Sequence, residues 1–84
     1  MFYVYVLKSQ KDGDCYVGST KDLRQRIKQH NEGKVKSTKP RRPLKLVYYE
    51  AYDSEKDARL RESKLKLKSQ AYLQLRKRIK FSID

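Results

Sequence analysis

The stretch YVGSTKDLRQRIKQH, residues 16–30, predicts a strand that ends and leads directly into a basic helix. Leu23 and Ile27 are four residues apart, so they share one face of that helix. Arg26 and His30 have the same spacing and lie on the adjacent stripe. The stretch therefore brings the tyrosine that opens it close to a helix presenting an arginine and a histidine.

Segments on both sides of this unit predict the rest of the fold. Aromatic and β-branched residues predict strands at residues 2–8, 15–18 and 44–52, and Asp12-Gly13 favours a hairpin between the first two. Both faces of the first strand are apolar, so we expect it to be central. Helical spacing predicts helices at residues 21–32, 55–67 and 70–81. The order ββαβαα indicates an α+β fold, a small antiparallel sheet packed by helices, in one domain over residues 1–84 with its core at about 1–68.

Each helix carries features that predict its ends or its buried face. Thr20 or Ser19 is expected to cap the first helix, with Asp22 in its first turn and Gly33 directly after its end. The inner faces of the second and third helices are expected to contain, respectively, Ala58, Arg61, Glu62 and Leu65, and Tyr72, Leu73, Arg76 and Ile79. A glutamate does not belong on an ordinary apolar stripe, so Glu62 becomes a candidate functional residue.

The strongest compositional feature is positive charge: 22 Lys and Arg residues against 10 Asp and Glu residues give a net charge of +12. Because the cations alternate with aromatic and apolar residues instead of forming a tail, this balance indicates a polyanionic partner, most often nucleic acid. No strongly amphipathic helix with Trp, Phe and Leu on one face supports an anionic membrane surface as the partner. Residues 34–43 are basic, contain both prolines and predict an exposed loop suited to lie along a phosphate backbone. The cations expected to position that backbone are Lys21, Lys28, Lys34, Lys36, Lys39, Arg41 and Arg42.

Cys15 is the only cysteine, which excludes an internal disulfide and a metal site built from cysteines alone. A thiol–imidazole pair with His30 is disfavoured because Cys15 and Tyr16 point to opposite faces of their strand, so a buried, inert cysteine is expected. The absence of a disulfide is typical of a reducing cytoplasm. The first residues do not resemble a signal peptide and no apolar run approaches transmembrane length, so we expect a cytoplasmic protein.

Five residues form a candidate catalytic constellation: Tyr5, Tyr16, Arg26, His30 and Glu62. Each alone has an ordinary interpretation as a core tyrosine, a surface cation, a helix-end histidine or a salt-bridge partner. Together, in a basic domain, they suit phosphodiester hydrolysis. A single carboxylate can hold one Mg²⁺ that keeps most of its waters, and an arginine can bind a phosphoryl oxygen bidentately. A tyrosine or histidine can accept the proton of the nucleophile.

The same residues occur in an order that resembles the GIY-YIG endonuclease domain, over residues 1–68. The first signature is matched by Tyr3-Val4-Tyr5 and the second by Tyr16-Val17-Gly18, with their signature tyrosines eleven positions apart, as is usual for the family. The segment that follows, through Arg26 and His30, is similar to that of phage homing endonucleases and of the N-terminal incision domain of bacterial excision repair. The length is most similar to the small stand-alone bacterial members.

The resemblance implies a three-stranded antiparallel sheet flanked by helices and a Mg²⁺- or Mn²⁺-dependent endonuclease that acts on DNA, in repair or recombination. Tyr16, with Tyr5, would activate or orient the attacking water. Arg26 would stabilise the scissile phosphate and His30 would relay a proton. Glu62 would hold the metal.

Two other functions are compatible with the sequence. A non-catalytic nucleic-acid-binding module that keeps the fold would use the +12 charge equally well. A small structural subunit whose basic face meets an acidic protein is the third possibility, without a positive feature in its favour. We expect a monomer or weak dimer, with a possible protein partner that directs it to its substrate.

Overall fold

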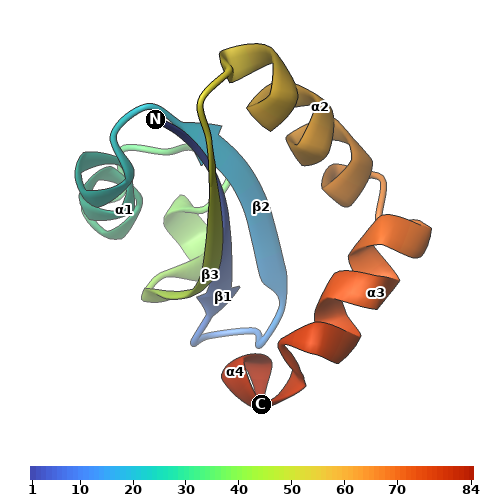
Figure 1. Cartoon of the computed structure of the whole chain (residues 1–84). Helices are drawn as coiled ribbons and strands as arrows, with labels where there is room; N and C mark the ends of the chain where they lie inside the picture. Colours follow the sequence, from blue (N-terminus) through green and yellow to red (C-terminus); the bar gives the residue numbers. More distant parts are fainter.

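The central strand of the sheet is β1 (Phe2–Ser9), as the apolar character of both its faces predicts. In the computed structural model, which describes residues 1–84, β1 pairs antiparallel with β2 (Cys15–Thr20) and with β3 (Leu44–Tyr52). The strand order is β2-β1-β3, so β2 and β3 are the edge strands (Figure 1). The predicted hairpin and the three-stranded antiparallel sheet are confirmed.

Helices cover both faces of this sheet. α1 (Leu23–Asn31) lies on one face, and α2 (Glu55–Lys66) and α3 (Gln70–Arg78) lie on the other (Figure 1). A short helix, α4 (Lys80–Ile83), completes the chain. The predicted α+β class and ββαβαα order are therefore confirmed. None of the helices has the length and hydropathy that crossing a bilayer requires.

Successive side chains of β1 point to opposite faces of the sheet, which divides the buried residues into two clusters. Val4 and Val6 are buried on the face covered by α2, α3 and α4, together with Val17 of β2. Tyr5 and Leu7 point to the opposite face, where the apolar stripe of α1 packs against them. A tyrosine is thus buried at the interface between the central strand and α1.

The N-terminal end of α1 differs from the prediction. Asp22, rather than Thr20 or Ser19, is the N-cap, and its carboxylate accepts a hydrogen bond of 3.1 Å from the backbone N–H of Gln25. The prediction is wrong because Ser19 and Thr20 continue β2, two residues beyond the expected strand end. Gly33 follows the helix with a φ of +79°, the left-handed conformation expected directly after a helix end.

The inner face of α3 is formed by Tyr72 and Leu75 and is continued by Ile79, all of which are buried. Leu73 and Arg76 were expected on this face, but both are exposed. Positions 72, 75 and 79 form a single helical stripe, whereas position 73 is rotated by about 100° from it. The helix is interrupted at Ile79, so the single helix predicted at residues 70–81 is divided into α3 and α4.

The basic connector between α1 and β3, residues 34–43, is less exposed than predicted. Val35 and Thr38 are buried, and a 3₁₀ helix forms at Lys39–Arg41. The remaining connector cations point to solvent, apart from Arg41, which is half-buried. The sequence prediction failed here because the burial of Thr38 depends on a partner in α1.

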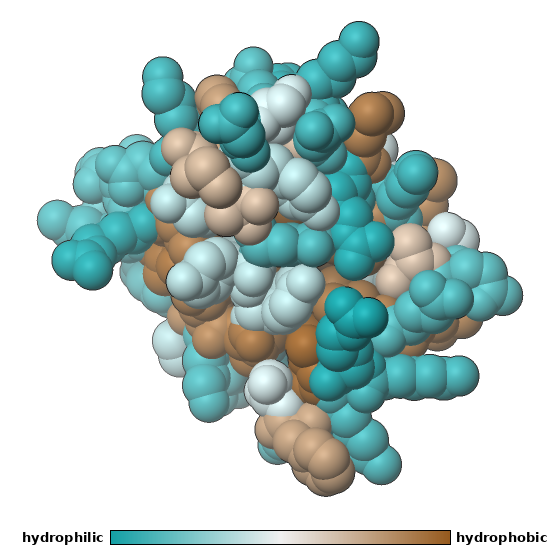
Figure 2. Space-filling model, in the orientation of Figure 1, coloured by the Kyte–Doolittle hydropathy of each residue, from teal (hydrophilic) through white to brown (hydrophobic).

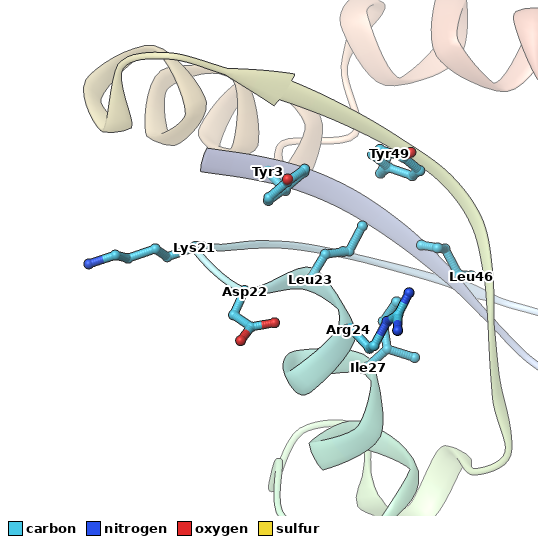
Figure 3. Close-up of a pocket in the computed structure, with 8 residues that line it drawn as sticks. All are labelled: Tyr3, Lys21, Asp22, Leu23, Arg24, Ile27, Leu46 and Tyr49. Atoms are coloured by element: carbon cyan, nitrogen blue, oxygen red, sulfur yellow. The ribbon is translucent and has the colours of Figure 1, made fainter. Parts of the chain in front are cut away.

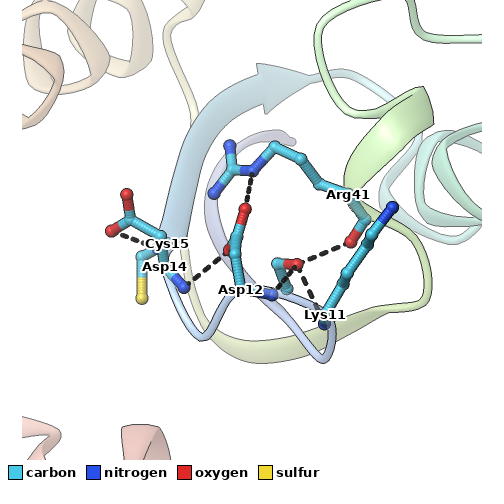
Figure 4. Close-up of polar contacts among 6 residues, drawn as sticks. Lys11, Asp12, Asp14, Cys15 and Arg41 are labelled. Carbon is cyan, nitrogen blue, oxygen red and sulfur yellow. Dashed lines mark hydrogen bonds and ion pairs between the residues drawn. The ribbon is translucent and has the colours of Figure 1, made fainter.

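The connector is fastened to the turn between β1 and β2 (Figure 4). Ser9 Oγ donates a hydrogen bond of 2.6 Å to the carbonyl oxygen of Arg41 and accepts from the backbone N–H groups of Lys11 and Asp12. Arg41 Nε donates to Asp12 Oδ2 at 3.1 Å. The backbone N–H of Asp14, assisted by Arg41, holds the pKa of the Asp12 carboxyl below its usual value.

Candidate active site

His30, at the C-terminal end of α1, is the buried centre of the site, with 0% of its surface exposed. Its Nε2 lies 2.8 Å from the hydroxyl oxygen of Tyr5, and its Nδ1 lies 2.7 Å from Thr38 Oγ1. These contacts join the central strand, α1 and the connector through one imidazole. Such an arrangement satisfies every polar atom of the imidazole, as a buried polar group requires.

The protonation states of this chain of contacts follow from burial. Burial, with the nearby Arg26 guanidinium, lowers the pKa of His30 to about 4, so the imidazole is neutral at neutral pH. Burial also raises the pKa of Tyr5 to about 12, an effect that Arg26 partly opposes. Both Tyr5 and His30 are therefore uncharged, and a neutral imidazole carries a proton on only one nitrogen.

The second hydrogen bond of Thr38, to Val35, indicates which imidazole nitrogen carries that proton. Thr38 Oγ1 donates to the carbonyl oxygen of Val35 at 3.4 Å, which leaves it to accept a hydrogen bond from His30 Nδ1–H. His30 Nε2 is then unprotonated and accepts a hydrogen bond from the hydroxyl group of Tyr5. The hydrogen bonds consequently run in one direction, from Tyr5 through His30 and Thr38 to the connector backbone.

Gly18 is the residue that permits Tyr5 to occupy this position. Tyr5 on β1 is opposite Gly18 on β2, and the phenol lies directly over the glycine. A Cβ on residue 18 would lie 2.5 Å from both Cζ and Oη of Tyr5, closer than any real contact. The second signature therefore ends in glycine because the phenol of the first signature fills the space of a side chain.

Tyr16 lies beside this buried chain at the edge of the sheet. Its ring packs edge-to-face on the His30 imidazole, with 5.2 Å between centroids and 64° between planes. Tyr16 is only half-buried, because β2 is an edge strand, whereas Tyr5 on the central strand is fully buried. Of the two signature tyrosines, Tyr16 is the one that an external ligand can contact.

Arg26 is one helical turn before His30 and is half-buried. Its Nη1 donates to Gln29 Oε1 at 3.2 Å, and no carboxylate forms an ion pair with it. Its charge lowers the pKa values of both Tyr5 and His30, which indicates that the guanidinium lies near both rings. Arg26 thus supplies positive charge to the site without an internal counter-ion.

Glu62 reaches the same edge from the opposite face of the sheet. It is on α2, and its Oε1 accepts a hydrogen bond of 2.8 Å from Ser19 Oγ of β2. Its Oε2 forms an ion pair with Lys66 at 3.1 Å, and the side chain is 19% exposed. The Lys66 ammonium also lies 5.7 Å from the centroid of the Tyr16 ring, so it bridges the carboxylate and the phenol.

The donor set at this edge fits one type of metal site. No group of three or more His, Cys, Asp or Glu side chains is close enough to enclose an ion, so a protein-only cage is not available. A single carboxylate suits Mg²⁺, which is commonly bound by one or two carboxylates and keeps several waters. Glu62 retains acceptor positions beyond its bonds to Ser19 and Lys66.

The structure therefore brings Tyr5, Tyr16, Arg26 and His30 together on the α1 face and places Glu62 at the adjoining edge of β2. Sequence reasoning missed Thr38 and Ser19, both of which contact members of this set. The serine could have been found from strand pairing, since residue 19 faces α2 once β2 is extended. The threonine has no local signal, because its partner is on another element.

Most of the predicted phosphate-binding cations are exposed, and hydrophilic side chains project from the face of the molecule that Figure 2 shows. Arg41 is engaged with Asp12, as described above. Only five of the 22 Lys and Arg residues are in ion pairs, so most of the positive charge is available to a ligand. The exposed members of the predicted set are Lys21, Lys28, Lys34, Lys36, Lys39 and Arg42.

Comparisons with known proteins agree on one family. Residues 1–78 match the family model described as the GIY-YIG catalytic domain. A UPF0213 protein of Staphylococcus saprophyticus is 46% identical over 65 residues, which are 76% of this chain and 78% of the relative. A UPF0213 protein of Clostridium perfringens is 46% identical over 67 residues, 79% and 71% of the two chains. The solution structure of a UPF0213 protein from Bacillus halodurans is similar with a TM-score of 0.55 and 38% identity, covering 89% of this chain and 81% of that one.

Proposed function

Because the chain belongs to the GIY-YIG family, a nuclease superfamily, we propose that it is a divalent-metal-dependent endonuclease that hydrolyses phosphodiester bonds in DNA. The observation that carries the proposal is the grouping of a half-exposed phenol, an arginine without a counter-ion and one carboxylate at the edge of β2. Metal-assisted hydrolysis of a phosphodiester uses three groups: one that orients or deprotonates the attacking water, a cation that binds the phosphate and a ligand for the metal ion.

Tyr16 is assigned to the attacking water. Its phenol is the partly exposed member of the tyrosine pair, and it packs against a neutral imidazole that fixes its ring. A hydroxyl at this position can accept a hydrogen bond from water and align it with the phosphorus atom.

Arg26 is assigned to the scissile phosphate. A guanidinium presents planar, paired donors that match two phosphoryl oxygens, and this geometry is retained as charge develops in the transition state. Its hydrogen bond to Gln29 fixes one end of the guanidinium and leaves further donors for the phosphate.

Glu62, oriented by Ser19, would hold Mg²⁺ or Mn²⁺ together with water, and the ion would offset the negative charge that develops on the phosphate. The Lys66 ammonium lies against Oε2 of the same carboxylate, so it would compete with a metal ion for the negative charge of Glu62. Without a metal ion, the Lys66 ammonium is the internal counter-ion of the Glu62 carboxylate.

Tyr5 and His30 are assigned as positioning residues. Both are fully buried, so they act on the substrate only through Tyr16 and Arg26, which they contact or lie beside. The hydrogen bonds of His30 to Tyr5 and Thr38 fix the imidazole against which Tyr16 packs. The exposed lysines and arginines would hold the phosphate backbone without reading sequence.

The test is nicking of supercoiled plasmid DNA in the presence of Mg²⁺ or Mn²⁺. Arg26→Ala is expected to reduce the rate by about 100-fold or more, because it removes a donor to the developing charge. Lys77→Ala removes the same charge from an exposed position of α3, outside the assigned site, and is expected to leave the rate near that of wild type. Activity that survives both Arg26→Ala and Glu62→Ala would contradict the site assignment.

The second candidate function is nucleic-acid binding without cleavage, which the net charge of +12 and the unpaired cations favour. It predicts binding that weakens steeply with salt, is unchanged by Glu62→Gln and is accompanied by no nicking with any divalent cation. Filter-binding measurements in parallel with the plasmid assay distinguish the two functions.

A further inference from the structure

A groove of about 720 Å³ lies on the α1 side of the sheet, and His30 is not among the residues that line it (Figure 3). Tyr3, Leu46 and Tyr49 line it from the strands, and Leu23, Arg24 and Ile27 line it from α1. Lys21 and Asp22 close the end where the chain passes from β2 into α1, and the Lys21 side chain extends outward from this rim.

The groove and the candidate active site are on opposite flanks of α1. Arg26 and His30 project from one side of the apolar stripe of the helix, toward Tyr16, whereas Arg24 projects from the other side, toward β3. Tyr3 is two residues from Tyr5 on β1, so both point to the same face of the sheet. A ligand that crosses the N-terminal end of α1 can therefore contact both regions.

The strand side of the groove is aromatic and open. Tyr3 and Tyr49 pack edge-to-face, with centroids 6.0 Å apart and planes at 64°. Tyr49 is 53% exposed although it is on a strand of the sheet and lies beside apolar residues of α1. Its ring is positioned to accept a planar group by stacking, in the way that aromatic platforms accept unpaired bases.

The rim of the groove is positively charged. Lys21 and Arg24 are exposed and neither is in an ion pair. Asp22, the only acid in the lining, is engaged as the N-cap of α1. This combination is complementary to a base flanked by phosphates, whereas a second copy of a chain with a charge of +12 would be repelled.

We propose that this groove binds an unpaired nucleotide of the nucleic-acid substrate, with the base stacked on Tyr49 and the adjoining phosphates contacted by Lys21 and Arg24. The inference rests on the nucleic-acid binding in the proposed function but not on cleavage. It makes a duplex with a single-stranded flank the preferred ligand over a fully paired duplex.

The experiment measures binding by fluorescence anisotropy in EDTA, which prevents cleavage. Three labelled probes are compared at the same salt concentration: a blunt duplex, the same duplex with a thymidine overhang, and the same duplex with an abasic overhang of equal length. The thymidine overhang is expected to increase affinity over the blunt duplex. The abasic overhang, which supplies phosphates without bases, is expected to lose most of that gain.

Variants locate the effect. Tyr49→Ala is expected to weaken binding of the thymidine overhang by about 5- to 150-fold and to leave the blunt duplex unaffected. Tyr49→Phe retains the stacking surface and is expected to bind like wild type. Phe81→Ala removes an aromatic ring that is 92% exposed on α4 and serves as the matched control. Arg24→Ala is expected to reduce the slope of log affinity against log salt by about 1.

Wild-type binding of the thymidine overhang by Tyr49→Ala, or full retention of the gain with the abasic overhang, would overturn the proposal. A concentration-dependent dimer, seen by sedimentation and abolished by Tyr49→Ala, would also overturn it, because the groove would then be the interface between two copies of the chain. Failure to bind any probe would also contradict the nucleic-acid binding in the proposed function. Binding of the blunt duplex without a gain from the overhang would contradict only the proposal for the groove.

Discussion

The hydroxyl oxygen of Tyr5 lies 2.8 Å from His30 Nε2, and this contact joins the central strand to α1 across 25 positions of the sequence. Both side chains are fully buried, so the bond is protected from water and its loss cannot be compensated by solvent. The contact also fixes the imidazole against which the half-exposed Tyr16 packs. Stability and the geometry of the site are therefore coupled through His30.

Removal of the Thr38 hydroxyl is expected to destabilise the protein. Thr38→Val keeps the shape of the side chain but leaves His30 Nδ1–H buried without an acceptor. The free energy of unfolding should fall by about 1–3 kcal/mol. Urea denaturation measures it, with Ser37→Ala at the adjacent exposed position as a control that stays within about 0.5 kcal/mol. Equal stability of Thr38→Val and wild type would contradict a stabilising hydrogen bond between Thr38 and His30.

Stability is expected to depend on pH through His30. Its pKa of about 4 in the folded protein lies below the value of about 6.5 for an unperturbed imidazole. Between these values the unfolded chain binds more protons, so stability rises with pH. The contribution of His30 is fully present above about pH 6.5 and is lost as pH falls toward 4.

Urea midpoints recorded across that range measure this dependence. The comparison variant is His30→Gln, which has no group that titrates there and should lack this part of the slope. The prediction is wrong if the variant and wild type lose stability in parallel between pH 6.5 and 4.

Gly18→Ala is expected to displace the Tyr5 phenol. The new methyl group would lie 2.5 Å from two atoms of that ring, at a cost of about 1–3 kcal/mol for overpacking. Gly13→Ala is the matched control, because residue 13 has a φ of +74° and nothing within 4 Å. It should also cost about 1–2 kcal/mol, through backbone strain alone.

Nuclear magnetic resonance of the His30 imidazole separates these two glycine variants. Gly18→Ala should shift the imidazole signals because Tyr5 moves, and Gly13→Ala should leave them in place. Unshifted signals in Gly18→Ala would show that Tyr5 is not held by the close approach to Gly18.

Lys66 is expected to compete with a metal for Glu62. Lys66→Met removes the ammonium from Oε2 and should increase the affinity for Mn²⁺, because the carboxylate no longer has an internal counter-ion. Line broadening of the Ser19 and Glu62 amide signals by Mn²⁺ measures the binding. Lys64→Met removes the same charge from an exposed position of α2 and is the control. Identical Mn²⁺ affinities for the two variants would contradict competition at Glu62.

Much of the fold follows from local patterns in the sequence. The apolar run of β1 predicted a central strand, and β3 was predicted with the bounds that the structure has. The N-cap of α1 was predicted at the wrong residue because four consecutive residues, from Ser19 to Asp22, include three with side chains that can cap a helix. Pairing of β2 with β1 decided the choice in favour of Asp22.

The finer features of the site depend on contacts between distant elements. Sequence reasoning could place Tyr5 and Tyr16 near each other, but their different burial follows from the positions of β1 and β2 in the sheet. Thr38 was treated as part of an exposed loop because its partner, His30, is on α1. Arg41 was expected to face phosphate and instead forms an ion pair with Asp12 at the turn before β2.

The rate at which the purified chain nicks supercoiled DNA in Mn²⁺, compared between wild type and Glu62→Gln, tests the central claim most directly. Glu55→Gln makes the same change at an exposed position of α2 and controls for the loss of a negative charge. We expect nicking by wild type and Glu55→Gln that EDTA abolishes, and a loss of about 100-fold or more in Glu62→Gln, because Glu62 is the only carboxylate at the edge of β2 assigned to the metal. Equal nicking rates for Glu62→Gln and Glu55→Gln would contradict the account.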